Sequence, residues 1–142
     1  MDLLLVEDNP ADAFLVRAAL APFLAQGTLQ LRTVTDGAQA LAFLRHYAPY
    51  TQVAAPDLVF LDLHMPGTSG YEVLAELHQD LALRAIPVVV LTSSENPRDM
   101  SQCYELGAST YLVKPIELEE FLTLVKNTVV FWSGCKFRTR KD

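Results

Sequence analysis

Five reactive side chains of this chain each lie at the end of a short apolar run. They are the carboxylates Glu7, Asp8 and Asp62, the hydroxyl of Thr92 and the amine of Lys114. Carboxylates that crowd together repel one another, so their charged forms require a cation nearby or a raised pKa. Mg²⁺ prefers oxygen ligands and keeps coordination positions for water and phosphate. The set therefore indicates a magnesium site at which a carboxylate could receive a phosphoryl group.

The residue types suggest separate roles within this set. Asp62 stands alone at the end of its run and is the expected nucleophile, because a carboxylate that attacks phosphorus gives an acyl phosphate. Glu7 and Asp8 are the expected metal ligands. Lys114 would neutralise a phosphoryl oxygen as a compact point charge, and Thr92 could hydrogen-bond another. Each residue alone has an ordinary structural explanation, and the specificity lies in their order on successive runs.

The apolar runs themselves are short and rich in Val and Leu, which is typical of strands buried on both faces of a parallel sheet. Strand and helix patterns alternate along the chain, which predicts βα units. Ligands of such sheets bind outside the carboxyl ends of the strands, so the reactive side chains should converge on one edge. The predicted fold is α/β: a flavodoxin-like, doubly wound (βα)5 sheet of five parallel strands in the order 2-1-3-4-5. The expected strands span about 2–6, 29–34, 57–62, 87–92 and 109–113, and the expected helices about 10–25, 38–47, 71–79, 97–106 and 117–132.

The pattern Asn-Pro-x-Asp occurs twice, from Asn9 and from Asn96, and is expected to start a helix each time. Asparagine caps free N–H groups, proline suits the first turn, and aspartate complements the positive helix end. The second of these helices has little apolar content beyond Met100, Cys103 and Tyr104. Few buried contacts mean low local stability, so this helix is a candidate for movement.

Length and composition exclude several classes of protein. A chain of 142 residues is expected to form one domain with its own core. No apolar stretch approaches the roughly 18–20 residues that span a bilayer, and no basic signal-peptide region begins the chain, so a cytoplasmic location without a membrane partner is expected. The net charge of −6 argues against nucleic-acid binding. Cys103 and Cys135 are expected to be reduced thiols.

The charge is distributed unevenly along the chain. The last seven residues carry four basic and one acidic side chain, so they contribute +3 and the remaining 135 residues contribute −9. We expect one domain over residues 1–133 and a basic C-terminal tail over residues 134–142. Such a tail is either a solvated terminus or a contact for an acidic face of a partner.

The last expected helix carries apolar residues on two faces. One stripe at helical spacing is expected to be core and comprises Leu118, Phe121, Leu122, Val125, Val129 and Trp132. Leu124, Val130 and Phe131 lie off this stripe. A second apolar face is typical of a protein contact, although contact with the chain's own tail explains it equally well. The expected dimer or partner face consists of Leu124, Val130, Phe131 and Trp132.

Four segments together resemble the receiver domain of two-component response regulators along nearly the whole chain. They span residues 4–9, 57–70, 89–92 and 107–115, and include Leu-Leu-Val-Glu-Asp-Asn, Met-Pro-Gly and Lys-Pro. The resemblance implies that a sensor histidine kinase donates a phosphoryl group from a phosphohistidine to Asp62. It also implies that Glu7, Asp8, Asp62 and the backbone carbonyl of His64 bind Mg²⁺.

The resemblance implies that Thr92 and Lys114 contact the phosphoryl group. The corresponding Lys-Pro bond is commonly cis in this family, so a cis bond is expected at Lys114–Pro115. The resemblance further implies a switch, in which Thr92 shifts and Tyr111 turns inward. A half-buried strand aromatic without that role is the alternative explanation of Tyr111. Asp57 lies at the opposite end of its strand and is expected to be structural.

The side chain two residues after the acceptor, here His64, usually faces the phosphorylation site and influences how fast water removes the phosphoryl group. Histidine is uncommon there. No output domain is expected, so the chain should act by protein contact or by phosphate relay. It is most similar to the small response regulators that partner bacterial phytochromes, which tend to form homodimers through the fourth helix, the fifth strand and the fifth helix.

The sequence leaves two rival functions to consider. A phosphatase or dehalogenase with an aspartyl nucleophile typically has a second acid two residues later, where this chain has His64, and carries a cap domain. We therefore expect no enzyme activity beyond the chain's own phosphotransfer and slow aspartyl-phosphate hydrolysis. The second rival is a degenerate receiver that binds partners without phosphorylation. The presence of every expected site residue argues against it.

Overall fold

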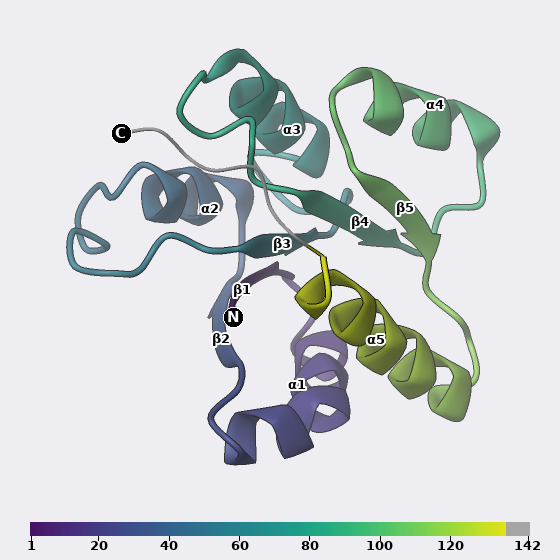
Figure 1. The fold of residues 1–142 in the computed structure, drawn as a ribbon. Coiled ribbons are helices and arrows are strands. Elements are labelled where there is room, and N and C mark those ends of the chain that lie inside the picture. Colours follow the sequence, from purple (N-terminus) through teal and green to yellow (C-terminus); the bar gives the residue numbers. More distant parts are fainter. Residues whose placement is uncertain (136–142) are drawn as a thin grey trace.

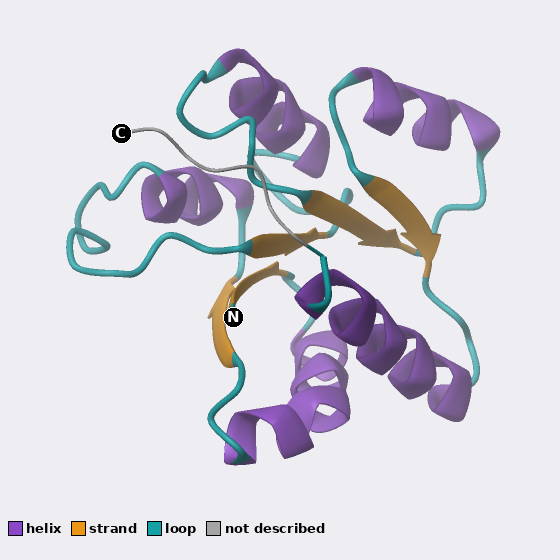
Figure 2. Ribbon diagram, in the orientation of Figure 1, coloured by secondary structure: helices purple, strands orange, loops and turns teal. Residues whose placement is uncertain are grey.

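Five strands alternate with five helices in the computed structural model, which describes residues 1–135 (Figures 1 and 2). All strand pairs are parallel, and the order β2-β1-β3-β4-β5 confirms the predicted doubly wound fold. The strands are β1 (Asp2–Val6), β2 (Gln30–Val34), β3 (Leu58–Leu61), β4 (Val88–Thr92) and β5 (Thr110–Val113). The helices are α1 (Pro10–Ala25), α2 (Gly37–Leu44), α3 (Gly70–Gln79), α4 (Pro97–Glu105) and α5 (Leu118–Ser133).

Helices cover both faces of the sheet. Figure 1 shows α1 and α5 on one face and α2, α3 and α4 on the other. Alternate residues of β1 divide between the two cores: Leu4 and Val6 pack with α2 and α3, whereas Leu3 and Leu5 pack with α1 and α5. Burial on both faces explains why the sequences of the three central strands β1, β3 and β4 are almost uniformly apolar rather than alternating.

The strands end together at the carboxyl edge of the sheet. Val6 of β1 pairs with Leu61 of β3. Backbone hydrogen bonds continue the ladder beyond this pair, because the Asp62 amide donates to the Val6 carbonyl at 3.1 Å. Between β4 and β5 the Lys114 amide likewise donates to the Thr92 carbonyl, at 2.7 Å. The residues that follow the strands are thereby held at one edge.

Both expected asparagine caps are confirmed. The Asn9 side chain accepts hydrogen bonds from the amides of Ala11 and Asp12, at 2.9 and 3.2 Å. The Asn96 side chain accepts from the Arg98 amide at 2.9 Å. These bonds satisfy amides that have no partner within the helix.

Helix α4 is anchored by few apolar contacts, as expected. Its one buried residue is Cys103, while Met100 and Tyr104 are exposed. The sequence prediction of a lightly held helix is therefore confirmed for its packing.

Helix α3 begins directly against the acceptor strand. The Gly70 amide donates to the Leu63 carbonyl at 3.0 Å. A Cβ at Gly70 would contact the Asp62 carbonyl oxygen and lie 2.7 Å from the Leu63 Cα. Glycine thus permits a close approach that a larger residue would block, and it places the first turn of α3 beside Asp62.

Helix α5 differs in part from its expected packing. Leu118 is 51% exposed, so its assignment to the core stripe is wrong; as the first residue of α5 it lines a surface cavity instead. Val130 and Phe131 are 50% and 65% exposed, in agreement with their place off the stripe. Leu124 and Trp132 are half-buried against the α1–α5 core, so only part of the expected partner face is open.

Two further predictions concern the chain as a whole. Among the described helices, none combines the length and hydropathy that crossing a bilayer requires. Of the expected basic tail, residues 136–142 lie outside the described part of the chain.

Candidate functional site

Three carboxylates converge at the carboxyl edge of the sheet. Glu7 and Asp8 follow β1 and Asp62 follows β3, and one oxygen from each lies within 4.8 Å of the others. Glu7 is only 3% exposed and Asp62 only 9%. The structure therefore brings together the three acidic side chains that the sequence singled out.

Lys114 reaches this cluster from the loop after β5. Its Nζ lies 2.6 Å from Glu7 Oε1, 2.8 Å from Asp12 Oδ2 and 4.0 Å from Asp62 Oδ2, and its side chain is 8% exposed. Burial lowers the pKa of Lys114, but the hydrogen bonds to Asp12 and Glu7 outweigh burial and hold this pKa above its ordinary value of 10.5. The amine is therefore a fixed positive charge at neutral pH.

For Glu7, the effect of burial on the pKa outweighs the effect of the hydrogen bond from Lys114. Burial raises the pKa of its carboxyl to about 7, although the hydrogen bond from Lys114 lowers it; the nearby charge of Asp62 raises it further. Glu7 consequently gains or loses its proton near neutral pH when no metal is bound. This is the physical cost of placing three carboxylates at one buried edge.

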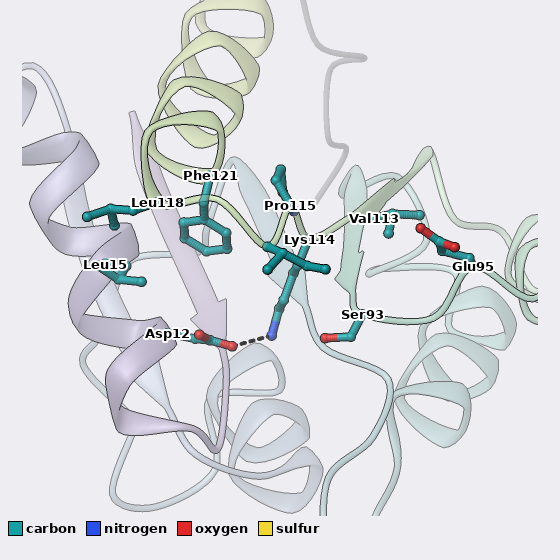
Figure 3. A pocket seen from close by; sticks show the side chains of 10 residues that line it. Asp12, Leu15, Ser93, Glu95, Val113, Lys114, Pro115, Leu118 and Phe121 are labelled. Carbon is teal, nitrogen blue, oxygen red and sulfur yellow. Dashed lines mark hydrogen bonds and ion pairs between the residues drawn. The ribbon is translucent and has the colours of Figure 1, made fainter.

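Asp12 is a site residue that the sequence interpretation missed, since it was assigned only to the start of a helix. Its carboxylate accepts a hydrogen bond from Lys114 at 2.8 Å. Figure 3 marks this contact with a dashed line. Both residues line a surface cavity of about 580 Å³. The available signal was that α1 begins at the same sheet edge, directly after Glu7 and Asp8.

The donor set fits a divalent cation. The Lys114 ammonium faces Glu7, Asp12 and Asp62. Asp8 lies beside Glu7 and Asp62, so four carboxylates share one positive charge and negative charge is in excess. Hard oxygen donors of this kind suit Mg²⁺, Mn²⁺ or Ca²⁺. The cluster Glu7, Asp8 and Asp62 would hold such an ion.

Thr92 and Tyr111 are connected through the loop between β4 and α4. Thr92 is fully buried, and its Oγ1 accepts a hydrogen bond from the Ser94 amide at 3.3 Å. Tyr111 is half-buried against the α2–α3 core, and its hydroxyl donates to the Ser94 carbonyl at 2.9 Å. The two expected switch residues therefore contact the same residue.

Three other expectations have different outcomes. Asp57 is structural as predicted, since its carboxylate accepts from the Asp2 amide at 2.8 Å at the far end of the sheet. His64 is exposed, and its ring lies edge-on to Tyr71 at a centroid distance of 6.4 Å.

The prediction of a cis bond at Lys114–Pro115 is wrong: the cis peptide bond of the described chain is Ala48–Pro49. Cis and trans differ by only about 0.5–1 kcal/mol before proline, so surrounding structure decides between them.

Comparison with known proteins agrees with this fold. Residues 3–126 match the family profile of the response regulator receiver domain. The response regulator Rcp1 of Synechocystis sp. is 40% identical over 130 residues, which cover 92% of this chain and 87% of Rcp1. The chain belongs to the response regulator receiver domain family.

Solved structures give the same result. The phosphorylated cyanobacterial phytochrome response regulator RcpA superposes with a TM-score of 0.89 at 38% identity, covering 97% of this chain and 98% of RcpA. The Mn²⁺-bound form of Rcp1 superposes with a TM-score of 0.88 at 37% identity, covering 97% and 99%. The chain is thus similar to phytochrome response regulators along almost its whole length.

Proposed function

We propose that Asp62 accepts a phosphoryl group from a phosphohistidine of a sensor histidine kinase in a Mg²⁺-dependent reaction. The observation that carries this proposal is the convergence of Glu7, Asp8 and Asp62 within 4.8 Å, beside the buried ammonium of Lys114. An Asp62 oxygen attacks phosphorus, the new O–P bond forms as the P–N bond breaks, and the histidine nitrogen keeps the electron pair. This is phosphoryl transfer to a carboxylate.

Each protein group has a defined task in this reaction. Glu7, Asp8 and Asp62, with the His64 carbonyl, would hold the cation. Bound Mg²⁺ would supply charge neutralisation for the acceptor carboxylate and the phosphoryl oxygens. Lys114 is already 4.0 Å from Asp62, so a phosphoryl group there would attract its ammonium away from Glu7. Thr92 would donate its hydroxyl to another phosphoryl oxygen.

The protein is proposed to transfer and slowly hydrolyse its own phosphoryl group rather than to turn over external substrates. Multiple turnover on a phosphate ester would instead support the phosphatase hypothesis. The similarity to the phytochrome response regulator RcpA supports a bacterial phytochrome as the kinase. The proposed site of action is the cytoplasm.

The central experiment is phosphorylation with acetyl phosphate and Mg²⁺, read by phosphoprotein mass. Wild type should gain one phosphoryl group, which Asp62→Asn should abolish and EDTA should prevent. Asp57→Asn is the matched control, because Asp57 belongs to the same strand region but binds the Asp2 amide at the other sheet edge. A folded wild type that takes up no phosphate would refute the proposal and favour a phosphorylation-independent binding module.

Homodimerisation is proposed to involve the exposed end of α5. Val130 and Phe131 are exposed there, and the Phe131 ring lies edge-on to Trp132 at 5.6 Å. Sedimentation at micromolar concentration, with and without a phosphoryl mimic, should show a dimer that Phe131→Glu weakens. Phe14→Glu on α1, at a residue of similar exposure, is the control and should leave the dimer intact. A monomer under both conditions would contradict this part of the proposal.

A further inference from the structure

A chain of polar contacts joins α3, the β4–α4 loop and α4 beside the candidate site. The Tyr71 hydroxyl donates to Asp99 Oδ1 at 2.7 Å, and the Ser94 hydroxyl donates to Asp99 Oδ2. We call Tyr71, Asp99 and Ser94 the strap. Tyr71 lies in the first turn of α3 and Asp99 in the first turn of α4, so the strap connects two helices that follow neighbouring strands.

Ser94 uses all of its polar groups in this arrangement. Its amide donates to Thr92 Oγ1 at 3.3 Å, and its carbonyl accepts from the Tyr111 hydroxyl at 2.9 Å. Its hydroxyl donates to Asp99. Any displacement of Ser94 therefore changes the surroundings of both Thr92 and Tyr111.

The strap also connects to the acceptor side of the site. Tyr71 lies edge-on to His64, two residues after Asp62. The α3 helix itself begins against the Asp62 carbonyl, where Gly70 permits close contact. The strap thus bridges the loops after β3 and β4, which flank the acceptor.

Charge makes these contacts strong. Hydrogen bonds from Ser94 and Tyr71 lower the pKa of the Asp99 carboxyl, while burial and the bond to Asp99 raise the pKa of the Tyr71 phenol. At neutral pH the pair is a carboxylate that accepts from a neutral phenol, which is a charge-assisted hydrogen bond. Since Cys103 is the one buried residue of α4, this polar anchor holds the end of α4 that apolar packing does not.

We infer that the strap positions the phosphorylation switch: Asp99, together with Tyr71, holds Ser94 so that Thr92 and Tyr111 move together. The inference rests on the proposed phosphorylation of Asp62. Without the strap, Ser94 loses its connection to α3, and Tyr111 can change its position without any change at the acceptor.

The test uses the full chain with ¹³C-labelled tyrosine rings and assigns the Tyr111 signal with Tyr111→Phe. Tyr71→Phe removes one hydroxyl and keeps the ring beside His64. Ser94→Ala removes the other contact, and Ser94→Thr should restore it. Tyr47→Phe, at an exposed tyrosine far from the strap, is the control.

In Tyr71→Phe and Ser94→Ala the Tyr111 signal should move or split before phosphorylation, and its further change on phosphorylation should shrink. The ratio of Tyr111 bonded to the Ser94 carbonyl to Tyr111 released from it should fall by about 2- to 30-fold, as expected for a coupling of about 0.5–2 kcal/mol. Acetyl phosphate should still label both variants. Signals identical to wild type in both variants would overturn the inference, whereas absence of labelling in folded wild type would overturn the proposed phosphorylation instead.

Discussion

Replacing Asp62 by asparagine should stabilise the metal-free protein, and structure sets the size of the effect. The Asp62 carboxylate lies within 4.8 Å of oxygens from Glu7 and Asp8 and 4.0 Å from the Lys114 ammonium. At an effective dielectric constant of about 20, each repulsion costs about 3.5 kcal/mol and the attraction returns about 4 kcal/mol. Two repulsions against one attraction leave a net cost of about 3 kcal/mol, which solvent screening reduces to about 1–3 kcal/mol.

The effect should depend on pH because Glu7 has a pKa of about 7 in the folded protein. At about pH 8 Glu7 is mostly ionised and both repulsions act. At about pH 6 it is mostly neutral, so one repulsion remains against the attraction to Lys114 and the two nearly cancel. Asp62→Asn should therefore raise the free energy of unfolding at the higher pH and change it little at the lower pH.

The assay is urea unfolding followed by circular dichroism, in EDTA and low salt, at both pH values. Asp57→Asn is the control, since its asparagine keeps an oxygen that can accept from the Asp2 amide. Adding Mg²⁺ should make wild type more stable than Asp62→Asn, because wild type keeps the carboxylate ligand that the variant lacks. An unchanged or lower stability of Asp62→Asn at about pH 8, or an equal gain at both pH values, would refute the electrostatic reasoning.

The same geometry gives four further predictions. Lys114→Met should lower the unfolding free energy at about pH 8 by about 3 kcal/mol, measured with urea, because it leaves buried carboxylates uncompensated; a gain in stability would contradict this. Glu7 has a folded pKa above its ordinary 4.5, so its proton is bound more tightly in the folded state, and stability is lost as pH rises from 4.5 to about 7. In Glu7→Gln this fall in unfolding free energy, measured by urea titrations across the same pH range, should be smaller by about 3 kcal/mol. An unaltered pH profile would contradict this prediction. Gly70→Ala should cost about 1–3 kcal/mol in the same assay, since its Cβ would lie 2.7 Å from the Leu63 Cα; wild-type stability would show that the helix can shift freely. Tyr111→Ala should leave phosphate labelling intact and uncouple it from dimerisation, which labelling and sedimentation measure together; a dimer that still responds to phosphorylation would exclude the switch.

The sheet and its reactive edge could be predicted from sequence because they depend on local patterns. A buried parallel strand must be apolar on both faces, so residues 3–6 of β1, all of β3 and residues 88–91 of β4 are continuous runs of Leu, Val and Phe. The residue after each run necessarily lies at the carboxyl edge. Glu7, Asp62 and Thr92 were therefore placed correctly without any knowledge of contacts.

Contacts between elements distant in the chain could not be predicted in this way. Asp12 and Lys114 are 102 residues apart, and their 2.8 Å ion pair depends on how α1 and the β5–α5 loop pack. The same holds for Tyr71 and Asp99, 28 residues apart on different helices. Short-range periodicity carries no information about such pairs.

Sequence alone thus determined the fold class and the members of the acidic cluster, because strand burial and strand ends are written in consecutive residues. Tertiary structure alone decided which carboxylates pair with Lys114 and which apolar residues of α5 remain exposed. It also decided whether the peptide bond before Pro115 is cis or trans. It also decided that Thr92 and Tyr111 meet at Ser94. These features are settled by distances between separate elements, where small differences in free energy select one arrangement among several that the sequence permits.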